Sequence, residues 1–258
     1  MNNKKVYKIV LVALFAALCY VGTMIHIPLP SGGMIHLGNF FCILAALLCG
    51  GLVGGFAGGI GCGLYDLIIY SDPVGFVQYF ILKFIMGFLV GSLFRIVLNK
   101  KLNYSLILSV LSVCLILFTS LVIVGYKTGN FKLSSSITNK DLYITIVTVI
   151  GYLFSLCIMI AAVFSLKLKK QYKELLFVCG LSVLVNIFLE FIAKIFVNLT
   201  INSLTMDAAL IKGFSSLPSC ILTGGVTVGF ICIIYPKLFA ATKNINFIND
   251  INESDLNE

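Results

Sequence analysis

Residues 50–63 read GGLVGGFAGGIGCG, and this run of glycines decides the fold. Glycine recurs at every fourth residue in two phases. One phase contains Gly50, Gly54 and Gly58, and the other contains Gly51, Gly55, Gly59 and Gly63. Residues four apart share a helix face, and in lipid a stripe of glycines lets two helix backbones come into van der Waals contact. The repeat therefore predicts a membrane helix that packs closely on a neighbour through Gly51, Gly55, Gly59 and Gly63.

A phosphate-binding loop is the alternative for Gly59-Ile60-Gly61-Cys62-Gly63. Such a loop lies between a strand and a helix and is followed by a Lys-Ser/Thr pair. This sequence has no Lys-Ser/Thr pair after Gly63. Helix packing is therefore the favoured interpretation. Shorter repeats of the same kind, Gly87 with Gly91 and Gly225 with Gly229, occur later in the chain.

The composition identifies lipid as the solvent. The chain has 258 residues, of which 60% are hydrophobic and 11% charged, against roughly 25% charged in an ordinary soluble domain. Its net charge of +8 comes from short clusters between apolar runs, which disfavours nucleic-acid binding. All nine cysteines lie in apolar runs without a C-x-x-C pair, so we expect buried thiols and neither a metal site nor a disulfide framework.

Apolar runs near the ~20 residues that cross a bilayer predict an all-α integral membrane bundle of about eight transmembrane helices. The first follows Lys4, Lys5 and Lys8, and we interpret it as a retained helix rather than a cleaved signal peptide. Residues 1–241 form the predicted helical domain, and residues 242–258 a disordered cytoplasmic tail. The predicted spans are Ile9–Ile27, Leu37–Val53, Gly55–Tyr70, Val74–Phe94, Ser105–Val124, Leu142–Leu166, Leu175–Leu199 and Met206–Ile234.

The distribution of basic residues predicts the orientation. With the N-terminus inside, the inner segments carry twelve of the 18 basic residues and the outer loops carry three. By the positive-inside rule, the chain is a multi-pass protein of the cell membrane with both termini in the cytoplasm.

Five charged residues lie within predicted spans: Asp66, Lys83, Glu190, Lys194 and Lys212. An ionised side chain near the bilayer centre costs about 2.5–3.5 kcal/mol, and all five fall within about 13 Å of an outer helix end. One interpretation is structural pairing, of Glu190 with Lys194 and of Asp66 with Lys83. The favoured one is a cavity that opens outward.

Polar residues near these charges extend the candidate site. Asn186, Glu190, Lys194 and Asn198 repeat every four residues and share a helix face. The outer segments Pro28–Gly33 and Ser71–Pro73 are candidate lids, and His36 is either a ligand contact or an ordinary polar residue. The candidate substrate-binding residues are His36, Asn39, Asp66, Tyr70, Lys83, Asn186, Glu190, Lys194 and Lys212.

Two further features concern the ligand. The aromatic residues Tyr65, Tyr70, Phe76 and Tyr79 are able to stack on a flat ring. The segment Lys212–Ser219 contains Pro218, which indicates either a helix break that exposes backbone groups or a packing kink.

Three stretches resemble the substrate-binding S components of energy-coupling factor (ECF) vitamin transporters, particularly the riboflavin-type branch. They are Ala13–Ala17, the run from Ile35–Asn39 through Gly63–Leu67, and Lys83–Gly87, with a weaker match at Ala208–Ser219. The resemblance implies a six-helix core that binds a vitamin from outside, here with a two-helix insertion at about 103–173.

The resemblance also implies partners. A membrane coupling protein would dock on the face of Ala13 and Ala17, and two ATPase subunits would power uptake. The residues alone leave open whether this small-residue face packs within the chain or against another protein.

The leading hypothesis is a vitamin-binding subunit that is not an enzyme and has no cofactor, metal or Walker motif of its own. Riboflavin is the first candidate substrate, and pyridoxine or hydroxymethylpyrimidine the second. An autonomous ion-coupled carrier, with Asp66 and Glu190 exchanging protons, is the rival. An intramembrane enzyme is disfavoured because the sequence shows no catalytic constellation.

Overall fold

The computed structural model describes residues 3–29, 33–99, 103–128, 140–168 and 170–242. Over these ranges the chain forms eight helices and one two-stranded hairpin, so the predicted all-α membrane fold is confirmed. The helices are α1 (Asn3–Met24), α2 (Gly38–Cys49), α3 (Gly51–Ile69), α4 (Pro73–Asn99), α5 (Tyr104–Lys127), α6 (Lys140–Lys167), α7 (Lys170–Thr200) and α8 (Met206–Thr242). The strands are β1 (His26–Pro28) and β2 (Met34–His36).

Six of the described helices are long and apolar enough to cross a membrane, namely α1, α3, α4, α5, α7 and α8. Two of the eight predicted spans are not among these six. They are Leu142–Leu166, where the apolar part of α6 is the shorter segment Gly151–Lys167, and Leu37–Val53. There α2 has 12 residues, about 18 Å of helix against a hydrocarbon core of ~30 Å. It ends because Gly50 adopts a positive φ of 95°, which glycine accommodates without steric cost, and α3 begins at the next residue.

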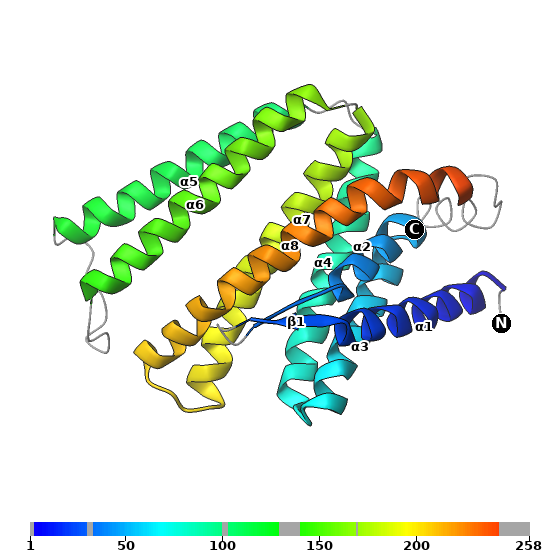
Figure 1. Ribbon diagram of the computed structural model, residues 1–258, viewed down its shortest axis with the longest axis horizontal. Coiled ribbons are helices and arrows are strands. Elements are labelled where there is room, and N and C mark those ends of the chain that lie inside the picture. The colour runs from blue at the N-terminus through cyan, green and yellow to red at the C-terminus, as the bar shows by residue number, and fades with distance from the viewer. Residues whose placement is uncertain (1–2, 30–32, 100–102, 129–139, 169, 243–258) are drawn as a thin grey trace.

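The bundle has two unequal parts (Figure 1). Helices α1 to α4 pack together, and α7 and α8 lie beside them as an antiparallel pair. Helices α5 and α6 pair mainly with each other and contact the rest of the bundle mainly through α7. In Figure 1 this hairpin stands apart from α7 and α8 along much of its length. It occupies the region where the sequence predicts an insertion at about 103–173.

The glycine stripe packs α3 against α4. A Cβ atom added at Gly55 would lie 2.9 Å from the carbonyl oxygen of Phe84, and one added at Gly59 would lie 2.8 Å from that of Phe80. Gly51 and Gly63 face Phe88 and Phe76 in the same way. The four phenylalanines also recur every fourth residue, and their rings stack along α4 at centroid distances of 6.1–6.3 Å.

The other faces of α3 are equally close to their neighbours. Gly58 faces Cys42 of α2, and Gly61 faces the Ala16 carbonyl of α1. Helix α3 is thus enclosed by α1, α2 and α4. Its close packing fixes the positions of these three helices, which carry polar side chains.

Local signals set the ends of the elements around the site. Asp72 caps α4, because its Oδ1 accepts hydrogen bonds from the backbone N–H groups of Val74 (3.0 Å) and Gly75 (2.9 Å). Pro73 follows at the first helical position, where a missing N–H has no cost. The β1–β2 hairpin pairs His26 with His36.

Helix α8 is continuous through Pro218, so the alternative of a helix break at Lys212–Ser219 is wrong. The hydroxyls of Ser216 and Ser219 donate to backbone carbonyls three residues earlier, at 2.8 and 2.7 Å, which supplies donors close to the proline. The predicted tail beyond Thr242 lies outside the described residues.

Candidate functional site

A polar cavity of about 380 Å³ lies between the hairpin and helices α1, α2, α3, α4, α7 and α8. Its size falls in the lower part of the ~300–1,000 Å³ range of small-molecule sites. The cavity brings together eight of the nine candidate substrate-binding residues: His36, Asn39, Asp66, Tyr70, Lys83, Asn186, Glu190 and Lys194. Lys212 is exposed and does not line it.

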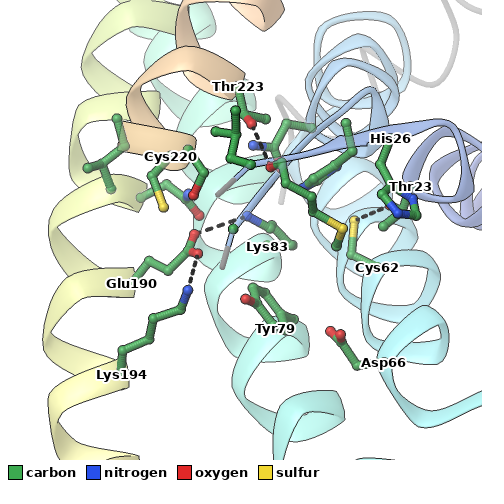
Figure 2. A pocket seen from close by; sticks show the side chains of 18 of the residues that line it. Thr23, His26, Cys62, Asp66, Tyr79, Lys83, Glu190, Lys194, Cys220 and Thr223 are labelled. Atoms are coloured by element: carbon green, nitrogen blue, oxygen red, sulfur yellow. Dashed lines mark hydrogen bonds and ion pairs between the residues drawn. The ribbon is translucent and has the colours of Figure 1, made fainter. Parts of the chain in front are cut away.

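The centre of the cavity is an ion-pair network around Glu190 (Figure 2). Its Oε2 lies 3.7 Å from Nζ of Lys83 on α4, and its Oε1 lies 3.6 Å from Nζ of Lys194, one turn further along α7. The Glu190–Lys194 pair agrees with the structural interpretation of the sequence. Lys83, however, pairs with Glu190 and not with Asp66, because α7 packs on α4 at this level.

Burial distinguishes the two lysines. The Lys83 side chain is 2% exposed, whereas that of Lys194 is 24% exposed. Lys83 also lies over the ring of Tyr79, 5.6 Å from its centroid, which is a favourable cation–π position. Lys83 is therefore held from two sides, and Asp66 on the same cavity wall remains available to a ligand (Figure 2).

Two carboxamides give the cavity unused hydrogen-bonding capacity. Asn39 on α2 and Asn186 on α7 are 5% and 4% exposed. Within the described part of the chain, the Oδ1 atom of each has no hydrogen-bond partner. A buried polar atom without a partner costs free energy, so both positions favour a ligand that supplies donors.

His36 adds a group with a defined tautomer. The Gly38 backbone N–H donates to its Nδ1 at 3.2 Å, so the neutral ring carries its proton on Nε2. Burial lowers the pKa of His36 to about 4, and the nearby positive charge of Lys83 acts in the same direction. His36 is therefore a neutral donor at physiological pH.

The hairpin covers the cavity and is tied to α8. The Thr223 hydroxyl donates to the Met34 carbonyl at 3.2 Å. Leu29 and Gly33, which flank the undescribed residues 30–32, both line the cavity. Of the predicted lid Pro28–Gly33, the structure thus describes Pro28, Leu29 and Gly33, and all three line the cavity.

An aromatic cluster stands beside the hairpin. The Tyr65 ring makes edge contacts with Tyr20, His26 and Tyr70, at centroid distances of 6.2, 6.1 and 5.7 Å. Of the four aromatics predicted to stack on a ring, Tyr70 and Tyr79 line the cavity. Phe76 belongs to the stacked phenylalanines of α4 that face the glycines of α3.

Sequence reasoning missed several lining residues, namely Thr23, His26, Cys62, Ser219, Cys220 and Thr223. Thr23 is buried; its hydroxyl donates to the Cys19 carbonyl at 2.8 Å and lies 3.6 Å from the Cys62 sulfur. A signal existed on α8, where Ser219 and Thr223 stand four residues apart on one face. Nothing in the sequence distinguishes Cys62 and Cys220 from the other apolar thiols, most of which are buried; Cys114 is exposed.

The small-residue face of α1 lies outside the bundle. Ala13 and Ala17 are exposed, as is Leu14 between them, whereas Ala16 is buried against α3. In the described chain this face has no packing role.

The arrangement can bind and orient a small molecule. Among the described residues, no group of three or more His, Cys, Asp or Glu side chains could hold a metal ion. The fold and the cavity together define a multi-pass membrane protein with a polar cavity between its helices.

Comparison with known proteins identifies the family. The family model described as "ECF-type riboflavin transporter, S component" matches residues 3–170, well over half of the chain. The chain therefore belongs to this family of vitamin-binding transporter subunits.

Other similarities are short. The chain is 46% identical over 50 residues to an uncharacterized protein in a gap 3' region of Pyrococcus woesei, a stretch that covers 19% of this chain and 34% of that protein. No solved structure matches the chain. The family match ends before the part of α7 that carries Asn186, Glu190 and Lys194, so a large part of the cavity wall lies beyond it.

Proposed function

We propose that the cavity captures a neutral, flat, water-soluble vitamin, with riboflavin as the first candidate and pyridoxine or hydroxymethylpyrimidine as the second. The observation that carries the proposal is the pair of buried carboxamide oxygens on Asn39 and Asn186, which lack partners within the described chain and line the cavity. A carboxamide both accepts and donates hydrogen bonds, and it therefore complements a ring edge of alternating carbonyl and N–H groups.

The charges of the cavity favour a neutral ligand. Lys83 and Lys194 face Asp66 and Glu190, two of each sign, and Glu190 already pairs with both lysines. Because Lys212 lies elsewhere, the excess of cations that the sequence suggests is not present in the cavity. A phosphorylated vitamin would have to displace an existing ion pair, so we expect riboflavin to bind at least tenfold more tightly than its phosphate ester.

The ring has surfaces to contact. Tyr70 and Tyr79 line the cavity together with the apolar side chains of Val183 and Ile187. Aromatic and aliphatic walls with few directed polar groups are typical of cofactor-sized sites.

Ligand identity is tested on the purified chain. Small molecules that co-purify are identified by mass spectrometry, and riboflavin, pyridoxine and hydroxymethylpyrimidine are titrated by calorimetry. We expect Asn39→Leu and Asn186→Leu each to weaken binding by about 1–3 kcal/mol, while the exposed control Lys212→Gln leaves it unchanged. A folded protein that binds no vitamin, or a Lys212→Gln effect as large as that of Asn186→Leu, would contradict the assignment.

Transport is proposed to be powered in trans by a membrane coupling protein and two ATPase subunits. The exposed face of Ala13 and Ala17 is the docking candidate, because its small side chains would let a partner helix approach closely. Ala13→Trp with Ala17→Trp should abolish uptake in cells and leave ligand affinity intact. Loss of both activities would indicate misfolding, and retained uptake would exclude this face.

The orientation that we propose places both termini in the cytoplasm. The start of α1 and the end of α8 lie at the same end of the bundle as the end of α4 and the start of α7 (Figure 1), and the sequence gathers most of its basic residues near these helix ends. The rival function, an autonomous carrier, predicts vitamin uptake into liposomes by the chain alone. The S-component proposal predicts none without the partner subunits.

A further inference from the structure

A second, apolar cavity of about 490 Å³ separates the α5–α6 hairpin from α7 and α8. Its walls come from Leu108 of α5, Leu153 and Ala161 of α6, Leu176 and Gly180 of α7, and Gly225 of α8. We call this cavity the lateral groove.

Two of the three glycines that line the lateral groove, Gly180 and Gly225, are open, whereas a Cβ atom added at Gly224 would lie 2.5 Å from Val183. A Cβ atom added at Gly180 or Gly225 would meet no described atom within 4 Å, whereas one at Gly55 or Gly59 would overlap α4. In a membrane, glycines on a helix face permit close approach of whatever packs there. Within the described chain no helix packs closely on Gly180 or Gly225.

A basic cavity of about 370 Å³ lies at the end of the lateral groove, between the start of α5, the end of α6 and the start of α7. Lys170 and Lys173 line it, with Asn103, Ser105 and Ser165. Lys170 pairs with Glu174 at 3.7 Å, and within the described chain Lys173 has no ion-pair partner. The hydroxyls of Ser105 and Ser165 already donate to the Ala162 carbonyl, at 3.1 and 2.7 Å. The two lysines and the side-chain NH₂ group of Asn103, whose Oδ1 accepts from the Leu106 N–H, therefore remain as donors for an anion.

The residues that line the two cavities follow one another along three helices. Ser105 and Leu108 on α5, Ala161 and Ser165 on α6, and Lys173 and Leu176 on α7 stand three or four residues apart, with one member in each cavity. Residues at this spacing share a helix face. The path from Lys173 to Leu184 is 11 residues, about 16 Å, which matches one leaflet of a ~30 Å hydrocarbon core.

From this juxtaposition we infer that one anionic phospholipid occupies the site. Its phosphate lies at Lys170 and Lys173, and an acyl chain lies in the lateral groove against Gly180 and Gly225. The charge of the basic cavity selects this occupant, because neither closure of the α5–α6 hairpin onto α8 nor docking of a second copy would use two lysines beside an apolar channel. The inference does not depend on which vitamin is bound.

A bound acyl chain would also support the vitamin cavity. Val183 and Ile187 line both the lateral groove and the polar cavity, so they form a shared wall. An acyl chain on the groove side of that wall would supply van der Waals contacts that Val183 and Ile187 lack when the groove is empty.

The inference is tested on the full chain in mild detergent, with native mass spectrometry and thermal unfolding in the presence of phosphatidylglycerol or phosphatidylcholine. We expect retention of phosphatidylglycerol in preference to phosphatidylcholine. Lys170→Gln with Lys173→Gln should weaken phosphatidylglycerol binding on the order of tenfold and remove the preference. The matched control is Lys5→Gln with Lys167→Gln, which changes the net charge equally at exposed positions outside the basic cavity and should retain it.

The groove is tested separately. Gly180→Leu with Gly225→Leu should fill the lateral groove and lower retention of both lipids, while Gly229→Leu, also at an open glycine but outside the groove, should not. Three results would each overturn the inference. They are equal retention of the two lipids by the unchanged protein, no effect of the lysine pair, and efficient crosslinking in bilayers between cysteines placed at Leu153 and Gly225, which would show that the hairpin closes instead.

Discussion

The Glu190 network allows a quantitative prediction, because one carboxylate pairs with two lysines at nearly equal distances but in different surroundings. The separations are 3.7 Å to Lys83 and 3.6 Å to Lys194, and the side chains are 2% and 24% exposed. At an effective dielectric constant near 20, two unit charges 3.7 Å apart attract by about 4.5 kcal/mol. Partly exposed pairs retain about 1 kcal/mol or less.

We therefore expect Glu190→Gln to destabilise the protein by about 3–5 kcal/mol, since it leaves Lys83 buried without its carboxylate. Lys83→Met should cost less, because Glu190 then keeps Lys194. In a double-mutant cycle, the coupling between positions 83 and 190 should be about 3 kcal/mol, and that between 190 and 194 should be below about 1 kcal/mol.

The measurement is reversible unfolding in mixed detergent micelles, followed by circular dichroism, for Lys83→Met, Lys194→Met, Glu190→Gln and the two double variants. Lys83→Met with Glu190→Gln should recover most of the stability that Glu190→Gln alone loses. Equal couplings for the two pairs would refute the argument that burial, rather than distance, sets the strength of these ion pairs.

Two further predictions concern packing and pH. Gly59→Ala should destabilise the protein by about 1–3 kcal/mol, because its Cβ would overlap the Phe80 carbonyl at 2.8 Å. The control Gly229→Ala, at an open position, should be neutral or stabilising by up to about 1 kcal/mol. Equal effects of the two substitutions in unfolding experiments would show that the glycine stripe does not pack as described. The pKa of His36 is lowered to about 4 from an ordinary value of ~6.5, so the folded state favours the neutral ring. The neutral His36 ring therefore makes its full contribution to stability above pH ~6.5, and this contribution is lost as the pH falls toward 4. His36→Gln should reduce the fall in melting temperature over this window relative to the unchanged protein, and an identical pH profile would contradict this assignment of the proton.

The sequence predicts those parts of the fold that repeat at short range. A four-residue period of glycines needs a partner with a matching period, and α4 supplies it with Phe76, Phe80, Phe84 and Phe88. Hydropathy finds the helices because each buries its backbone hydrogen bonds internally. Hydropathy overestimates the length of α2, because the apolar run continues past Gly50 although the backbone turns at that residue.

The sequence predicts the members of the site better than their pairing. Burying a charge is costly wherever it occurs in a span, so Asp66, Lys83 and Glu190 are recognisable individually. Which of them meet depends on how α4 and α7 pack, more than 100 residues apart, and Lys83 pairs with Glu190. Lys212 shows the opposite case, because a charge close to a helix end can reach solvent and need not face the interior.

Helix α1 connects the polar cavity with the proposed docking face. Thr23 near its end lines the cavity, and Ala17 lies six residues earlier, about 9 Å along the same helix. Between them Gly22 lies against Phe41 and Cys19 lies against Gly61, so α1 cannot tilt at one end without repacking against α2 and α3. A ligand that contacts Thr23 can therefore affect the docking face through movement of α1 as a rigid unit. Thermodynamic linkage then requires that docking of a partner alter vitamin affinity by the same factor by which the vitamin alters docking.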